Sequence, residues 1–160
     1  MPPAKIPAYQ GFYTPGTTKV YICPAFTNYL SPTRGELDAG LDVTRQVREI
    51  NDFSYEADVI DRPDMENTYT PTIGGRTKSS NPSLVIYAAK NGIDARQTLV
   101  FGYSGFVVLL DGGDVAGYKM DVWPVGVIAK PKQRGDSDPL NIMYQFNIPQ
   151  APAEDVTIPS

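Results

Sequence analysis

The sequence has 160 residues, a mass of 17.5 kDa and a net charge of −4, from 14 Lys and Arg against 18 Asp and Glu. This length fits one folded domain with room for appended segments. The absence of histidine and the single cysteine, Cys23, exclude intrachain disulfides, histidine-based triads and histidine metal sites. The mild negative charge disfavours tight binding to nucleic acid phosphates. The 14 Gly, 15 Pro and 10 Tyr favour strands and turns over helices.

The first 16 residues predict an extended arm. They contain four prolines, which exclude a helix and a central strand, together with Tyr9 and Tyr13. No charged region followed by an apolar run is present there, so no signal peptide is indicated. The longest apolar run, 106–110, is far shorter than the ~20 residues of a membrane span. We therefore expect a soluble chain, made in the cytoplasm, with no membrane partner.

Taken in chain order, seven segments have the alternating pattern or the short apolar run that is typical of strands. They are 17–23, 44–50, 53–60, 83–88, 106–110, 118–130 and 140–148. In the first of them, Val20 and Ile22 are expected on one face, and Tyr21 and Cys23 on the other. Segment 53–60 has the clearest alternation, because its apolar positions point one way and its polar positions the other.

Two short helices are expected between these strands. Thr33 and Glu36 have the spacing of a capping box, and Gly40 suits the position that follows a helix end. These capping residues predict a helix of one or two turns. A second short helix is expected within 93–101.

The stretch 61–82 predicts a long loop, because it is polar and is interrupted by prolines and glycines. A loop of this length is unusual in a compact domain and is usually functional or disordered. A hairpin arm involving Tyr69, Thr70, Thr72 and Ile73 would fit within it.

The strands cluster without regular alternation with helices, which predicts an all-β antiparallel sandwich or barrel over 17–148. An N-terminal arm, 1–16, and a C-terminal arm, 149–160, flank this domain. The second arm carries Val156 and Ile158 in alternation. Both arms have two interpretations: they are frayed tails, or they are segments that dock on a neighbouring subunit through scattered apolar side chains.

Three patterns suggest chemistry without meeting its requirements. Asp111, Asp114 and Asp121 suit calcium, but they lack the spacing of an EF-hand, and a tight turn explains them as well, so metal binding by the first two stays open. The carboxylates of 58–66 could act as an acid and a base, but such pairs are common on acidic surfaces. Ser104 lacks the final glycine of a nucleophile elbow and a histidine base. We predict no enzyme and no catalytic, cofactor or metal-binding residue.

Five segments occur in a recognisable order. They are PTRGELDAGLDVT (32–44), INDFSYEADVIDRPD (50–64), TIGGRTKSSNPSLVIYA (72–88), VVLLDGGDVAGYKMDVWPV (107–125) and QFNIPQAPAEDVTIP (145–159). Over about residues 20–160 this run closely resembles the tail tube, or major tail, proteins of long-tailed bacteriophages infecting actinobacteria. DGGDVAGYKMDVWPV and APAEDVTIP are the most specific parts, whereas the proline-rich first 16 residues are less typical.

The resemblance implies a β-sandwich with a flanking helix that assembles as hexameric rings stacked into the tube of the virion tail. A long hairpin loop and the terminal arms would bridge neighbouring subunits and rings, other tail proteins would bind the tube ends, and synthesis would take place in the host cytoplasm. Double-stranded DNA would pass through the lumen without specific binding. Six copies at −4 each carry 6 × −4 = −24, and an acidic wall repels phosphates.

Particular residues are candidates for these roles. The polar face with Glu56 and Asp58 is the best candidate for the lumen, with an ordinary solvent-exposed face as the alternative. The candidates for contacts between subunits are Arg62, Tyr69, Pro71, Ile73 and Arg76 in the loop, and Val156 and Ile158 in the C-terminal arm.

Two other functions compete with the tube subunit. An immunoglobulin-like decoration or adhesin module would be a stable monomer or trimer with exposed ligand loops. A small hydrolase that uses carboxylates is the weaker alternative, because histidine and the required motif spacing are missing.

Overall fold

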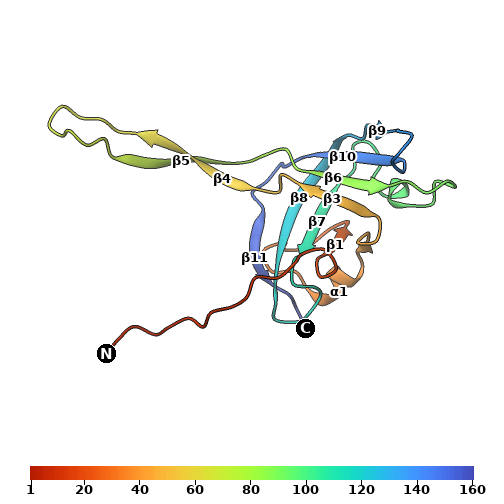
Figure 1. Cartoon of the computed structure of the whole chain (residues 1–160), viewed down its shortest axis with the longest axis horizontal. Coiled ribbons are helices and arrows are strands. Elements are labelled where there is room, and N and C mark those ends of the chain that lie inside the picture. Colours follow the sequence, from red (N-terminus) through yellow and green to blue (C-terminus); the bar gives the residue numbers. More distant parts are fainter.

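The computed structural model describes residues 1–160 and confirms an all-β chain with little helix (Figure 1). The strands are β1 (Lys19–Cys23), β2 (Leu41–Asp42), β3 (Val47–Asn51), β4 (Tyr55–Asp61), β5 (Thr72–Ser79), β6 (Ser83–Tyr87), β7 (Ser104–Leu110), β8 (Lys119–Ala129), β9 (Lys132–Gln133), β10 (Asn141–Asn147) and β11 (Ala153–Thr157). The helices are α1 (Arg34–Asp38) and the 3₁₀ turn η1 (Ala95–Gln97). Nine strands form one sheet, and β4 and β5 form a separate hairpin.

The large sheet runs in the order β2-β1-β7-β8-β10-β6-β3, with every pair antiparallel. Strand β8 joins its two halves. One edge of β8 pairs with β7, while the other edge pairs first with β11, at 119–122, and then with β10, at 126–129. Strands β7 and β8 cross β6 and β10 at a steep angle in Figure 1. A bulge between Gln145 and Phe146 lies at the β8–β10 pairing, where such irregularities increase bending and twist.

Each face of this sheet is covered by a different apolar cluster. Val107 and Leu109 of β7 belong to a cluster of 15 buried residues that also contains Trp123 of β8. Val108 and Leu110 belong to a second cluster on the opposite face. Burial on both faces explains the uninterrupted apolar run of this strand. The predicted faces of β1 are confirmed in the same way, because alternate residues of β1 contact alternate clusters.

Helix α1 covers the second cluster with Leu37. The predicted capping box is present: the Glu36 backbone N–H donates to Thr33 Oγ1 (3.3 Å), and the Thr33 N–H donates to Glu36 Oε2 (2.9 Å). The backbone N–H groups of Thr33 and Thr27, which donate to this carboxylate, lower the pKa of Glu36 to about 2. Gly40 does follow the helix end, but its role is close packing, since a Cβ there would lie 2.6 Å from Cys23 Sγ.

One prediction of local structure is wrong and another is only partly right. The segment 93–101 forms only the single turn η1, because Asp94 closes a tight loop by accepting hydrogen bonds from the Ala89 N–H (2.7 Å) and from Arg96 (2.9 Å). The stretch 61–82 is not an irregular loop throughout, since strand β5 occupies 72–79 and pairs with β4. The predicted hairpin arm is thus present in part, with Thr72 and Ile73 in a strand and Tyr69 and Thr70 outside it.

Candidate functional site: surfaces for assembly

The β4–β5 hairpin stands away from the body of the molecule (Figure 1). It forms a two-stranded sheet of its own, with pairing from Tyr55 opposite Ser79 to Asp61 opposite Thr72. Beyond that last pair, the Arg62 N–H donates to the Pro71 carbonyl (2.8 Å). An isolated two-stranded hairpin is at best marginally stable in water, so this one needs a further surface against which to pack.

The apolar side chains of the hairpin are uncovered. Tyr69 is 77% exposed, Val59 70% and Ile73 50%. The alternation of 53–60 therefore does not place the whole segment on the core, because only Phe53 and Tyr55 pack against the main cluster. A bulge between Ala57 and Val59 interrupts the pairing, and the strand continues beyond the body.

The predicted site residues of the hairpin lie in three places: at its tip, along β5 and on β4. Arg62, Tyr69 and Pro71 lie at or next to the tip, while Ile73 and Arg76 lie along β5. Glu56 and Asp58 lie on β4 opposite β5. Lys78 is the partner of Glu56 in the pairing and binds Asp58 Oδ1 through Nζ at 3.0 Å. The polar face proposed for the lumen therefore includes one cation.

The N-terminal segment is a second projection (Figure 1). No hydrogen bond joins residues 1–13 to the rest of the chain, and the first is at Thr14, which accepts from Thr17 (3.0 Å). Ile6 and Tyr9 are 86% and 82% exposed. Like the hairpin, this segment offers apolar side chains to which its own chain gives no partner.

The C-terminal segment behaves differently, because Val156 and Ile158, the predicted candidates for docking on a neighbour, pack on their own chain in the structure. Strand β11 pairs with β8 of the same chain, Val156 packs against the second cluster, and Ile158 is 1% exposed within it. The Ile158 N–H donates to the Tyr118 carbonyl (2.7 Å), and the Gly117 N–H donates to the Ile158 carbonyl (3.0 Å). These side chains complete their own domain.

The turn after β7 is fixed by an ion pair. Asp114 accepts two hydrogen bonds from the Arg34 guanidinium (2.6 and 2.8 Å) and one from the Tyr21 hydroxyl (2.9 Å). Arg34 is the main reason that the pKa of Asp114 lies below its usual range. Burial, followed by Asp114, raises the pKa of Tyr21 to about 12. No group of three carboxylate or thiol side chains is placed to hold a metal, and Asp114 is already neutralised.

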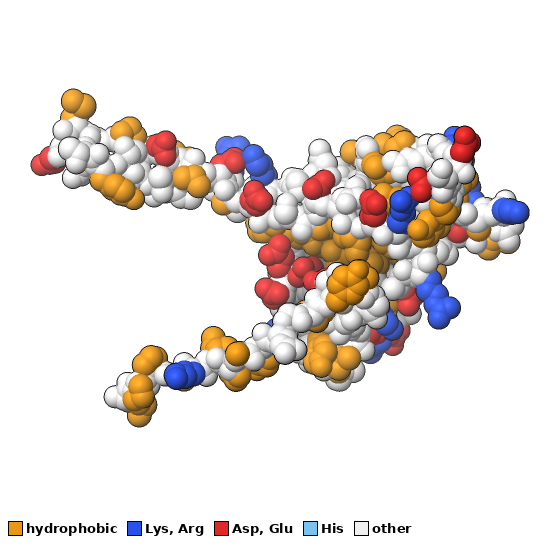
Figure 2. Space-filling view, in the orientation of Figure 1, with side chains coloured by type: hydrophobic (Ala, Val, Ile, Leu, Met, Phe, Trp, Pro, Cys, Tyr) orange, Lys and Arg blue, Asp and Glu red, His pale blue; other side chains and the backbone are white.

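A groove of about 670 Å³ lies beside this turn. Its walls include Phe12 and Tyr118, and its carboxylates are Asp111, Asp121 and Asp155. Burial raises the pKa of Asp121, and the charges of Asp111 and Asp155 raise it further. Acidic side chains gather over β11 in Figure 2. No local sequence pattern marks this groove, because it joins segments up to about 140 residues apart.

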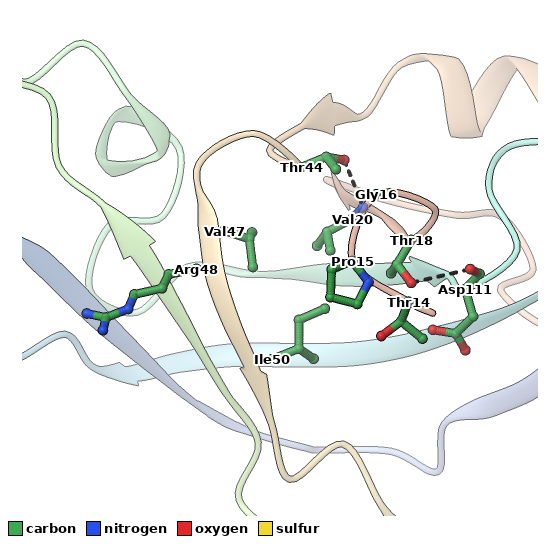
Figure 3. A pocket seen from close by; sticks show the side chains of 10 residues that line it. All are labelled: Thr14, Pro15, Gly16, Thr18, Val20, Thr44, Val47, Arg48, Ile50 and Asp111. Carbon is green, nitrogen blue, oxygen red and sulfur yellow. Dashed lines mark hydrogen bonds between the residues drawn. The ribbon is translucent and has the colours of Figure 1, made fainter. Parts of the chain in front are cut away.

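A second groove, of about 450 Å³, lies between β1 and β3, near the two ends of the sheet (Figure 3). Val20, Val47, Ile50 and Pro15 point toward one another across it, and Arg48 points away. Thr44 Oγ1 accepts from the Val20 N–H (3.0 Å) at its edge. The free edge of β3 therefore lies beside a groove that combines apolar side chains with threonines and Asp111.

Together, a β-sheet body, a projecting apolar hairpin and an unattached arm define a structural subunit built to contact other proteins. The sequence matches the family described as phage tail tube protein over residues 6–160. The chain belongs to this family and is a structural component of the phage tail. A search of curated proteins finds no match. No helix in the structure is long and apolar enough to cross a membrane.

Proposed function

We propose that copies of this chain assemble into hexameric rings, that the rings stack into the tail tube, and that double-stranded DNA leaves through the lumen. The observation that carries this proposal is the hairpin, which has two strands, no covering layer and exposed Val59, Ile60 and Ile73. Burying a side chain of this kind stabilises by about 1.5–3 kcal/mol. A neighbouring subunit supplies the surface that the hairpin lacks.

The charge of the chain supports the conduit part of the proposal. Six copies carry 6 × −4 = −24, so the assembled wall repels DNA and does not release counterions to bind it. Glu56 and Asp58 face the lumen in this proposal. Other tail proteins close the tube ends, and the subunits are made in the host cytoplasm before assembly.

Electron microscopy of the purified protein in negative stain tests the proposal. We expect rings or tubes roughly 10 nm across, the size of six domains of about 30 Å around a pore. Replacing Val59 and Ile73 by Asp should abolish assembly and leave the body folded, because neither side chain contributes to the two core clusters. The control, Ile73→Val, keeps the apolar surface and should assemble.

Two results would contradict the proposal. One is a wild-type protein that stays monomeric at high concentration. The other is an oligomer that is unchanged when Val59 and Ile73 are both replaced by Asp in a chain whose body stays folded. The second result would instead favour a decoration or adhesin module, whose loops bind ligands and do not hold copies together.

A further inference from the structure

The groove beside the Asp114 turn holds an unusual excess of unpaired negative charge. The three carboxylates that line it are Asp111, Asp121 and Asp155, and Glu154 lies directly before Asp155 in β11. None of these four side chains forms an ion pair within the chain. Lys119 is the one cation that lines the groove, and its ammonium donates to Thr157 Oγ1 (2.8 Å). Asp114, only a few residues away, differs because Arg34 neutralises it.

The shape of the groove selects the kind of group that would neutralise these carboxylates. Tyr118 and Phe12 form aromatic walls and are 52% and 60% exposed. Asp121 lies in the groove and accepts a hydrogen bond from the Asp155 N–H (3.0 Å). Aromatic surface beside carboxylates suits a long cationic side chain, whose stem packs on the rings while its head reaches the acids.

The same chain carries unpaired cations at the other end of β8. Asp121 lies near the start of this strand and Lys130 directly follows its end, which corresponds to roughly 30 Å along a strand. Lys132 in β9 and Arg134 extend this basic end, and neither forms an ion pair. Asp136 and Asp138 follow in the next loop and leave residues 130–138 with a net charge of +1, from three cations and two acids.

We propose that the groove receives Lys132 and Arg134 of a second copy, so that successive subunits contact head to tail. This inference rests on the proposed assembly and specifies one of its contacts. A heterologous contact needs two different, complementary surfaces on one subunit, and the acidic groove and the basic end meet that need. Complementary charge also fixes the orientation, since groove against groove would place like charges together.

A charge-swap experiment tests this contact. The end variant carries Lys132→Glu and Arg134→Glu, and the groove variant carries Asp121→Asn and Glu154→Lys. We expect each variant alone to need at least about tenfold more protein than wild type to assemble, measured by sedimentation and negative stain. We expect an equimolar mixture to assemble, because each altered surface then finds a complementary partner. Lys132→Arg with Arg134→Lys keeps the charge and serves as the control.

The outcomes separate the two proposals. If wild-type protein forms no rings or tubes, the proposed function fails. If wild type assembles and the end variant assembles equally well, the proposed contact is wrong. If both variants are folded by thermal melting, fail alone and also fail when mixed, charge pairing between these surfaces is again excluded. Rescue by mixing supports the contact.

Discussion

The two ends of the chain have similar compositions and opposite structures. Residues 1–16 contain four prolines and 149–160 contain three, and both predict extended arms. The first end projects without a hydrogen bond before Thr14, whereas the second returns to its own sheet as β11 and buries Ile158. Proline content therefore indicates an extended segment and does not indicate what that segment contacts.

The difference follows from whether each segment can pair with an open strand edge of the body. Strand β10 pairs with β8 only from residue 126 onward, which leaves the edge of β8 at 119–122 open. The C-terminal segment fills this edge, and Ala153 and Ile158 enter the second cluster. The N-terminal segment passes near the free edge of β3 but does not pair with it, and its prolines lack the N–H groups that a strand would donate.

The largest expected effect is at Ile158. Ile158→Ala should lower the free energy of unfolding by about 2–5 kcal/mol, because it leaves a cavity in the second cluster. Ile6→Ala, at the other end, should have no measurable effect, since Ile6 is exposed. Urea unfolding at neutral pH measures both, and Ile158→Val should lose only about 0.5–1.5 kcal/mol. Equal effects of Ile158→Ala and Ile6→Ala would erase the distinction between the two ends.

How much the sequence predicts depends on whether a pattern is local. The faces of β1, the capping box at Thr33 and Glu36, and the all-β class follow from neighbouring residues and are confirmed. The pairing of β11 depends on the edge of β8 that β10 leaves free. No residue pattern near Ile158 indicates that this edge exists. The same holds for the acidic groove, whose Phe12 and Asp155 meet only after folding.

The hairpin shows a different limit. An alternating strand reads the same whether its apolar face meets its own core or another subunit, so Val59 could not be assigned from sequence. The adjacent Val59 and Ile60, with a bulge before them, are the local sign that the alternation ends there. Charged Asp58 and Asp61 on either side of this pair are consistent with a segment outside the core.

The next effect in size concerns the turn after β7, whose Gly117 N–H donates to the Ile158 carbonyl. Asp114→Asn removes the ion pair of a carboxylate that is 11% exposed, and should lower the free energy of unfolding by about 1–3 kcal/mol. The pKa of Asp114 is lowered by folding, so its contribution is complete above the unfolded value of about 3.9 and is lost as the pH falls from there through the lower folded-state pKa. The stability difference between wild type and variant, measured by melting between pH 7 and pH 3, should therefore be constant at first and shrink below about pH 4. A constant difference down to pH 3 would contradict this role.

A smaller effect of opposite sign is expected at Asp121. Folding raises its pKa through burial and the nearby carboxylates, so ionised Asp121 destabilises the monomer, and this penalty disappears as the pH falls through the folded-state pKa. Asp121→Asn keeps an acceptor for the Asp155 N–H and should raise the free energy of unfolding at pH 7 by up to about 1 kcal/mol. Thermal melting of the monomer at pH 7 measures the gain. A loss of stability would mean that the charge itself supports β11.

The smallest effect concerns the N-terminal end. Deleting residues 1–13 should change the free energy of unfolding by no more than about 0.5 kcal/mol, because these residues form no hydrogen bond and bury no core side chain. The deletion should nevertheless weaken assembly, which sedimentation measures, if Ile6 and Tyr9 are covered only in contact with another subunit. If the deletion unfolds the body, the N-terminal end contributes to the folded state as β11 does. A deletion that leaves both properties unchanged would show that neither Ile6 and Tyr9 nor the Phe12 wall of the acidic groove contributes to subunit contacts.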